Sequence, residues 1–318
     1  MSEFEKVMKE AAREAAEEEE IAERAVFDDI AEGKSGRKGY GEKMNEKRAQ
    51  CYAMIEDACL DAVASTENLK KFLAVQSRFE KYSLNNNLLI YAQKPAAVRF
   101  RDFNAWVEDG VSVEGAKSFV ILEPHKYTAA DGSIRRGYNP KKVFDIADVD
   151  VPESEYPKAQ SYEQKKLLEA LVHDSPVPIR RTEKALGDRL AVYDPEQKAV
   201  FFKSGMGFDQ IFPALAQALS HAQMAMEAER YQVREHEFAA RCSAYTISLK
   251  YGADTKAADI HTIPQRFETM DAEDIKKELL EIHDSVKAIT ERMAEVLEKT
   301  QYKEPPQSKN RRTREVRE

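Results

Sequence analysis

The chain has 318 residues, enough for about two domains, with 42% hydrophobic and 33% charged residues. No stretch approaches the roughly 20 consecutive apolar residues of a membrane span, and the acidic N-terminus is unlike a signal peptide. We therefore expect a cytoplasmic protein without a membrane contact. Cys51, Cys59 and Cys242 have no C-x-x-C spacing, which predicts neither a disulfide framework nor cysteine ligands for zinc.

The net charge of −8 argues against a protein that coats nucleic acid with its whole surface. The charge is nevertheless uneven along the chain. Residues 68–145 hold 13 Lys/Arg against 8 Asp/Glu, whereas residues 1–67 hold 10 against 18 and residues 146–318 hold 26 against 31. The positive middle segment indicates an anionic partner for that part of the chain alone.

The N-terminal stretch is polar and rich in Ala and Glu, and over residues 2–32 it predicts a solvated helix or a disordered arm. The following GKSGRKGYG, residues 33–41, has four glycines in nine residues and predicts a flexible break. We group residues 1–43 as an acidic helical arm and a glycine-rich linker. From Met44 to about Tyr91, apolar residues recur at helical spacing and predict helices that pack on one face.

Beyond Val98 the pattern changes to short β-branched runs, at 118–124 and 142–149, with a hairpin tip expected at 131–138. Helices followed by strands predict an α+β domain over residues 44–150. The segment VPESEYPKAQ, residues 151–160, contains two prolines and predicts a linker.

A second, mostly helical domain with a small sheet is expected over residues 161–268. Its predicted elements are a helix at 162–173, a hairpin at 189–202 and helices around 208–229 and 233–251.

Residues 269–318 predict a long helix, capped by Asp271, and a basic tail. Apolar residues over 271–298 alternate spacings of four and three, as in a coiled-coil seam. The seam could bind a protein partner, support self-association or dock on its own chain, and the sequence leaves these alternatives open.

The helix that contains ALAQALSHAQ, residues 214–223, differs from a zinc-peptidase helix at two decisive positions. In His-Glu-x-x-His, two imidazoles one turn apart hold zinc and the Glu acts as general base. Here Gln217 and Ala218 stand where the first His and the Glu would be, and only His221 remains. Zinc needs three protein ligands, so we expect no metal, no cofactor and no hydrolysis at this helix.

Residues 82–117 combine aromatic, amide and cationic side chains, the mixture that holds single-stranded nucleic acid through stacking and phosphate contacts. Trp106 and Phe103 are more often core residues in such a pattern, whereas Tyr82 and Tyr91 fit either role. The candidate DNA-binding residues are Tyr82, Asn85, Asn86, Tyr91, Gln93, Lys94, Arg99, Arg101, Trp106 and Lys117.

Three blocks in this region resemble a known family. YSLNNNLLIYAQKP, FRDFNAWVEDGVSVEGAKSFVILEP and KVFDIADV are similar, in that order, to the N-terminal domain of ArdC-like antirestriction proteins, including the LtrC-like members of conjugative elements. The resemblance covers roughly residues 65–150. It implies a helix-plus-sheet domain that binds single-stranded DNA, in an accessory protein of a mobile element.

The second half resembles the zincin-like metallopeptidase domain of the same family, through the hairpin at 189–202 and the two helices that follow. The resemblance aligns the family's metal-site positions with Gln217, Ala218 and His221. Its acidic third ligand aligns with either Glu237 or Ala239, and we prefer Ala239. These positions imply a degenerate site in a pseudo-metallopeptidase.

Three functions therefore compete. The first is a single-stranded-DNA-binding accessory protein with an inactive peptidase-like domain. The second is a metalloprotease with an atypical site drawn from His221, His236 and Glu237, although neighbouring residues on a helix point about 100° apart. The third is a protein-interaction module that works through the acidic arm and the heptad helix.

Overall fold

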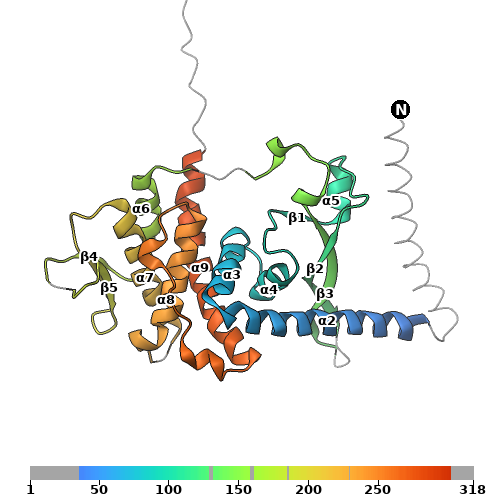
Figure 1. Ribbon diagram of the computed structural model, residues 1–318, viewed down its shortest axis with the longest axis horizontal. Helices are drawn as coiled ribbons and strands as arrows, with labels where there is room; N and C mark the ends of the chain where they lie inside the picture. Colours follow the sequence, from blue (N-terminus) through green and yellow to red (C-terminus); the bar gives the residue numbers. More distant parts are fainter. Residues whose placement is uncertain (1–35, 129–131, 158–160, 185, 229, 302–318) are drawn as a thin grey trace, which may run out of the picture.

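A computed structural model describes residues 36–301 except 129–131, 158–160, 185 and 229. The predicted α+β class is confirmed: helices dominate and two small three-stranded sheets lie toward opposite ends of the molecule (Figure 1). Within the described residues, no helix is both long and apolar enough to span a membrane. The predicted arm over residues 2–32 and the tail beyond residue 301 lie outside the described residues.

Three helices open the described chain: α2 (Gly36–Ala64), α3 (Thr66–Arg78) and α4 (Leu84–Gln93). The Ser65 and Ser83 hydroxyls cap α3 and α4 by accepting from the backbone N–H three residues on. The predicted break at 33–41 is wrong from Gly36 onward, where α2 begins. Extending an existing helix costs less free energy than starting one. The packed half of α2 therefore allows the helix to continue through its glycine-containing first turns.

The first sheet is an antiparallel hairpin with a short third strand, in the order β1-β3-β2. Its elements are β1 (Phe100–Arg101), β2 (Ser118–Thr128) and β3 (Ile134–Asp145), with α5 (Phe103–Glu108) between β1 and β2. The strands extend well beyond the predicted runs, so most of the expected tip belongs to β3. After β3 the chain forms 3-10 turns, Ile146–Asp148 and Glu153–Glu155, rather than continuing as a strand to 149.

The second half contains every element that its pattern predicts. These are α6 (Gln164–Val172), β5 (Ala191–Asp194), β6 (Ala199–Phe202), α7 (Phe208–Glu227) and α8 (Val233–Lys250). The strand β4 (Ile179–Arg181) was not predicted. The sheet order is β4-β6-β5, with β5 and β6 forming the predicted hairpin. Two 3-10 turns, Lys256–Ala258 and Gln265–Glu268, lead to the last helix.

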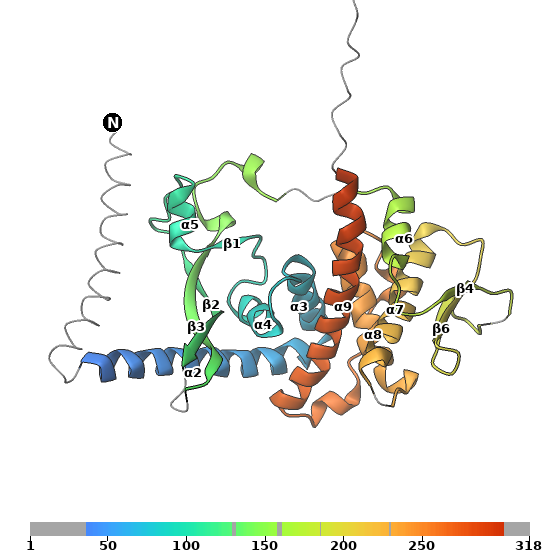
Figure 2. The same cartoon turned by 180° about the vertical axis from the view of Figure 1, so that it is seen from behind.

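The last helix, α9 (Ala272–Gln301), lies between the two halves and contacts both (Figures 1 and 2). It packs against α6, α7 and α8 on one side and against α2 and α4 on the other. Its seam is buried within the protein, so the chain itself occupies the surface that self-association would need. The buried positions are Ile275, Leu279, Ile282, Val286, Ile289, Met293 and Leu297.

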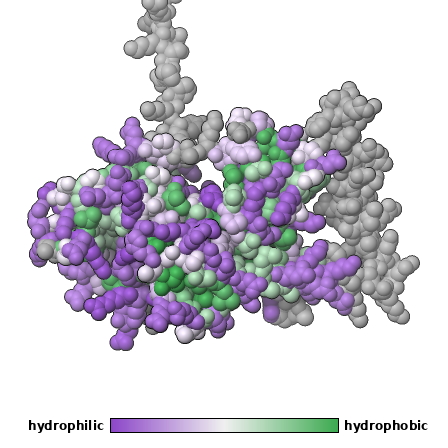
Figure 3. Space-filling model, in the orientation of Figure 1, coloured by the Kyte–Doolittle hydropathy of each residue, from purple (hydrophilic) through white to green (hydrophobic). Residues whose placement is uncertain are grey.

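One continuous hydrophobic core runs from Cys51 to Leu297 and includes residues from both predicted domains. A smaller cluster forms around Trp106, Ile146 and Val149. On the face shown in Figure 3, hydrophilic side chains cover most of both halves, and the hydrophobic areas are small and separate. The two predicted domains, residues 44–150 and 161–268, therefore share one hydrophobic core.

The packing of α9 predicts a sharp contrast between two neighbouring aliphatic residues. Ile282→Ala should lower the free energy of unfolding by about 2–5 kcal/mol, because Ile282 is fully buried and its truncation leaves a cavity. Leu280→Ala is the control, since Leu280 is 43% exposed and its loss should change stability by less than about 0.5 kcal/mol. Urea denaturation measures both, and equal effects would contradict the buried seam.

Candidate functional site

Two of the amide side chains proposed to contact DNA instead complete the first sheet. Asn86 donates to the Leu122 carbonyl (3.0 Å) and accepts from the Leu122 N–H (2.7 Å). Gln93, two turns along α4, pairs in the same way with the carbonyl (2.8 Å) and N–H (2.9 Å) of Val120. These amides make the backbone hydrogen bonds that a neighbouring strand would make at the edge of β2, so they are not free to contact a base.

Lys94 is also held inside the structure. Its ammonium lies 2.9 Å from the Asp145 carboxylate and 2.6 Å from that of Asp148. The Asp145 side chain is fully buried and accepts from the backbone N–H groups of Val98 and Arg99. A buried carboxylate needs such partners, so Lys94 neutralises Asp145 rather than a phosphate.

The largest aromatic side chains among the predicted residues are buried. Trp106 is almost fully buried and donates its Nε1–H to the Phe144 carbonyl. Tyr91 is buried, and its hydroxyl lies 2.5 Å from the Asp61 carboxylate. Of the two alternatives for Trp106, the structure shows the core residue, and Tyr91 is unavailable for stacking in the same way.

The remaining predicted residues keep part of their surface accessible. Arg99 and Arg101 lie with their guanidinium groups 5.8 and 5.3 Å from the centre of the Trp106 ring, and Arg101 also pairs with Asp109. Lys117 is exposed over the Phe119 ring, and Tyr82 and Asn85 are half-buried. The predicted surface is thus reduced to these five side chains.

In the second half, the structure brings Gln217, His221 and Glu237 together from α7 and α8. The Gln217 amide donates to one Glu237 oxygen (2.9 Å), and His221 Nε2 lies 3.3 Å from the other. The Tyr231 hydroxyl lies 2.5 Å from His221 Nδ1, and burial raises the pKa of Tyr231, so the hydroxyl stays protonated and donates. That leaves the Nε2 hydrogen of His221 facing Glu237.

Two arginines complete this cluster. Arg189, which precedes β5, and Arg241, one turn beyond Glu237 on α8, lie 3.4 and 3.5 Å from the Glu237 carboxylate. The His221 hydrogen bond, opposed by burial and reinforced by the arginines, lowers the pKa of Glu237 to about 2. Glu237 is therefore a stable anion at neutral pH.

This donor set does not fit a catalytic zinc. Zinc is held by imidazole, thiolate and carboxylate groups, and only His221 and Glu237 are of these kinds. Gln217 donates to Glu237, and the two guanidinium groups already supply the positive charge that a metal would bring. Among the described residues, no group of three His, Cys, Asp or Glu side chains could hold a metal ion.

The two candidates for the acidic position, Glu237 and Ala239, lie in different surroundings. Glu237 faces Gln217 and His221, whereas Ala239 is buried and is absent from the cleft that these residues line. The preference for Ala239 is therefore wrong in this geometry. Two positions along a helix turn a side chain by about 200°, which explains why a small error of alignment moves it to the opposite side.

The cleft above the cluster has a volume of about 250 Å³. Its walls are residues 188–193, which lead into β5 and run along it, and the facing residues of α7 and α8. Ala218 lies at this cleft and offers no group that could accept a proton from water.

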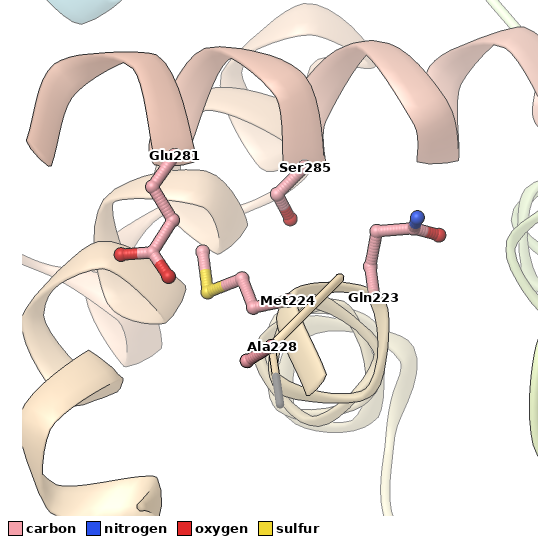
Figure 4. A pocket seen from close by; sticks show the side chains of 5 residues that line it. All are labelled: Gln223, Met224, Ala228, Glu281 and Ser285. Atoms are coloured by element: carbon pink, nitrogen blue, oxygen red, sulfur yellow. The ribbon is translucent and has the colours of Figure 1, made fainter. Parts of the chain in front are cut away.

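His236 pairs with Glu281 of α9 and not with His221 or Glu237, so the atypical site drawn from these three residues is not assembled. Its ring stacks on Tyr231 (4.5 Å between centres), and its Nδ1 lies 2.5 Å from the Glu281 carboxylate. Glu281 and Ser285 of α9 point toward Met224 of α7 across a separate cavity of about 160 Å³ (Figure 4).

Comparison with known proteins gives one kind of match. No protein-family model and no curated protein matches the chain. The chain aligns with the metal-free crystal structure of the antirestriction ArdC protein from the R388 plasmid, with 16% identity, 67% of this chain and 86% of that chain covered, and a TM-score of 0.44. The Mn(II)-bound structure of that protein gives 12% identity, 68% and 84% coverage, and a TM-score of 0.46.

Three members of the Glu237 cluster were not expected from the sequence: Arg189, Tyr231 and Arg241. The spacing of four between Glu237 and Arg241 is a recognisable helix ion-pair signal. Arg189 and Tyr231 carry no local signal, because each reaches the cluster from a loop through tertiary packing alone.

The lowered pKa of Glu237 predicts acid-sensitive stability. A carboxyl group whose folded pKa is about 2 stabilises the fold above its ordinary pKa of 4.5 and loses that contribution as the pH falls from 4.5 to 2. Glu237→Gln should therefore lower the Tm at pH 7 and flatten its fall over this range. Glu235→Gln, an exposed position on the same helix, should leave the curve unchanged.

The donor set predicts that the unmodified protein binds no stoichiometric zinc. Gln217→His combined with Arg189→Ala and Arg241→Ala should bind about one zinc per chain, because two imidazoles and the Glu237 carboxylate would then meet at one point. Adding Glu237→Gln should abolish that binding, and adding Ala239→Glu to the latter should not restore it. Elemental analysis distinguishes these results. Stoichiometric zinc in the unmodified protein would contradict the claim that its donor set does not bind zinc.

Proposed function

We propose that the chain is a single-stranded-DNA-binding, antirestriction-like accessory protein of a mobile element, with a peptidase-like half that does not hydrolyse peptides. The positive charge of residues 68–145 supports the DNA-binding part, together with the three sequence blocks that resemble ArdC-like proteins. The strongest support is that some of these positive side chains are exposed and form no ion pair with a described residue. Lys117, Lys126, Arg136 and Lys142 are exposed and have no carboxylate partner among the described residues.

Cations without a carboxylate partner are better suited to binding phosphate than paired ones. A cation that already neutralises a buried carboxylate, as Lys94 does, gains little from a phosphate. An exposed cation without a partner releases condensed counterions when it meets a phosphate, which favours binding at low salt.

The chemistry of the cleft supports the absence of hydrolysis. Peptide hydrolysis by a zincin requires a metal-polarised water and a carboxylate that takes its proton. Ala218 supplies no such base, and Glu237 is committed to Gln217, His221 and the two arginines. We infer that this half serves as a packed scaffold. Alternatively, it offers a surface that binds another protein.

The titration that tests this proposal uses a labelled single strand and the matching duplex. We expect tighter binding to the single strand, since unstacked bases can contact side chains that a duplex cannot reach. Each phosphate contact should contribute about −0.7 to the slope of log affinity against log salt. Equal affinity for duplex, or no binding to either at low salt, would leave the protein-interaction module as the better function.

A further inference from the structure

The far half of the β2–β3 hairpin extends beyond the hydrophobic core. Phe119, Leu122 and Val143 are the last strand residues buried in that core, and the side chains beyond them are mostly accessible. Three large side chains are exposed there: Tyr127 (45%), Ile134 (75%) and Tyr138 (39%). A hairpin that projects such residues gains nothing for the core, which indicates a surface that serves a contact.

The strand register sorts these side chains onto two faces. Lys126 pairs with Arg136, Pro124 with Tyr138 and Val120 with Lys142. Paired residues share a face, and alternate residues along a strand point the same way. Lys126, Arg136, Tyr138 and Lys142 therefore lie on one face, here named the hairpin stripe. Pro140 and the buried Leu122 occupy the same face between Tyr138 and Lys142.

The opposite face is used internally. A Cβ at Gly137 would lie 2.7 Å from the His125 ring, so the His125 side chain packs directly over this glycine. Tyr127 lies beside His125, with 5.8 Å between ring centres. Asn139, on the same face, accepts a hydrogen bond from Arg48 of α2. Helix α2 thus backs this face and leaves the hairpin stripe on the other.

The charges of the hairpin differ in their partners. Lys141 is neutralised by Asp102 (2.9 Å) and Glu123 (2.7 Å). Lys126, Arg136 and Lys142, the three cations of the hairpin stripe, are exposed and have no carboxylate partner among the described residues. A tyrosine ring thus shares this face with three unpaired cations.

We propose that the hairpin stripe is the surface that binds single-stranded DNA, an inference that rests on the proposed function and places it on residues outside the 82–117 segment. Lys126 and Arg136, which lie opposite each other on the two strands, would contact phosphates at one end of the stripe and Lys142 a phosphate at the other end. The Tyr138 ring would stack on a base between the two ends. Stacking requires an unpaired base, so the stripe selects single strands over duplex. The hairpin stripe would allow DNA binding although Tyr91, Lys94 and Trp106 are buried or paired.

The experiment titrates the full chain and its variants with labelled oligothymidylate of about 20 nucleotides, longer than the usual single-strand footprint. Tyr138→Ala should weaken binding about 5- to 150-fold, the effect of losing one stacked base. Tyr127→Ala is the matched control, because it removes the same ring from the opposite face and should bind as the unmodified protein does.

The charge test uses a second matched pair. Lys126→Ala with Arg136→Ala should reduce the magnitude of the log–log salt slope by about 1.4, the loss of two phosphate contacts. Lys165→Ala with Arg180→Ala removes two exposed cations from the other half and should leave the slope unchanged. Far-UV circular dichroism and Tm should be the same for all variants, since every substituted side chain is at least partly exposed.

The outcomes separate the two proposals. If the unmodified protein binds oligothymidylate and the stripe variants bind equally well, the hairpin stripe is refuted and the proposed function stands. A loss in Tyr127→Ala as large as that in Tyr138→Ala would overturn the assignment of the face. If the unmodified protein binds no single strand at low salt, both proposals fail.

Discussion

The packing of α9 is the constraint on which the rest of the structure depends. Its buried seam fills the space between the helices of both halves, and His283 adds a hydrogen bond from Nε2 to the Tyr82 carbonyl (2.9 Å). A coiled-coil pattern thus closes one chain instead of joining two. Because the halves share this core, the sheet with its hairpin and the cleft with its ion-pair cluster are fixed parts of one body.

Charge pairing and hydrogen bonds, all made by side chains, hold the cluster around Glu237 together. A metal ion normally supplies positive charge and ties its ligands together, so that folding depends on metal supply. Here two guanidinium groups supply the charge, and the Gln217 amide and the His221 ring supply the hydrogen bonds. This contact between α7 and α8 depends on Glu237 remaining ionised.

The sequence predicted what local pattern determines. Helical periodicity located α7, α8 and α9, and the Asp-Pro turn located the β5–β6 hairpin. It did not reveal that Asn86 and Gln93 serve the edge of β2, because those bonds join residues 36 and 27 positions apart. The hairpin stripe was missed for a related reason: its shared face is defined only once the register of two strands is known. The predicted break at 33–41 was wrong from Gly36 onward, because extending the packed helix α2 outweighed the low helix propensity of glycine.

The two hairpin prolines have a consequence for how molecules of this protein meet in solution. Residues 120 and 122 of β2 direct their N–H and C=O groups outward, as the bonds from Gln93 and Asn86 show, so Pro124 is the next outward position on that edge. Pro140 lies opposite Leu122 and is outward on the β3 edge. At both positions the missing N–H costs the hairpin no bond, and it removes a donor that a strand of a neighbouring molecule would need. The protein can thus hold a long, exposed hairpin in solution while disfavouring sheet growth and aggregation between copies.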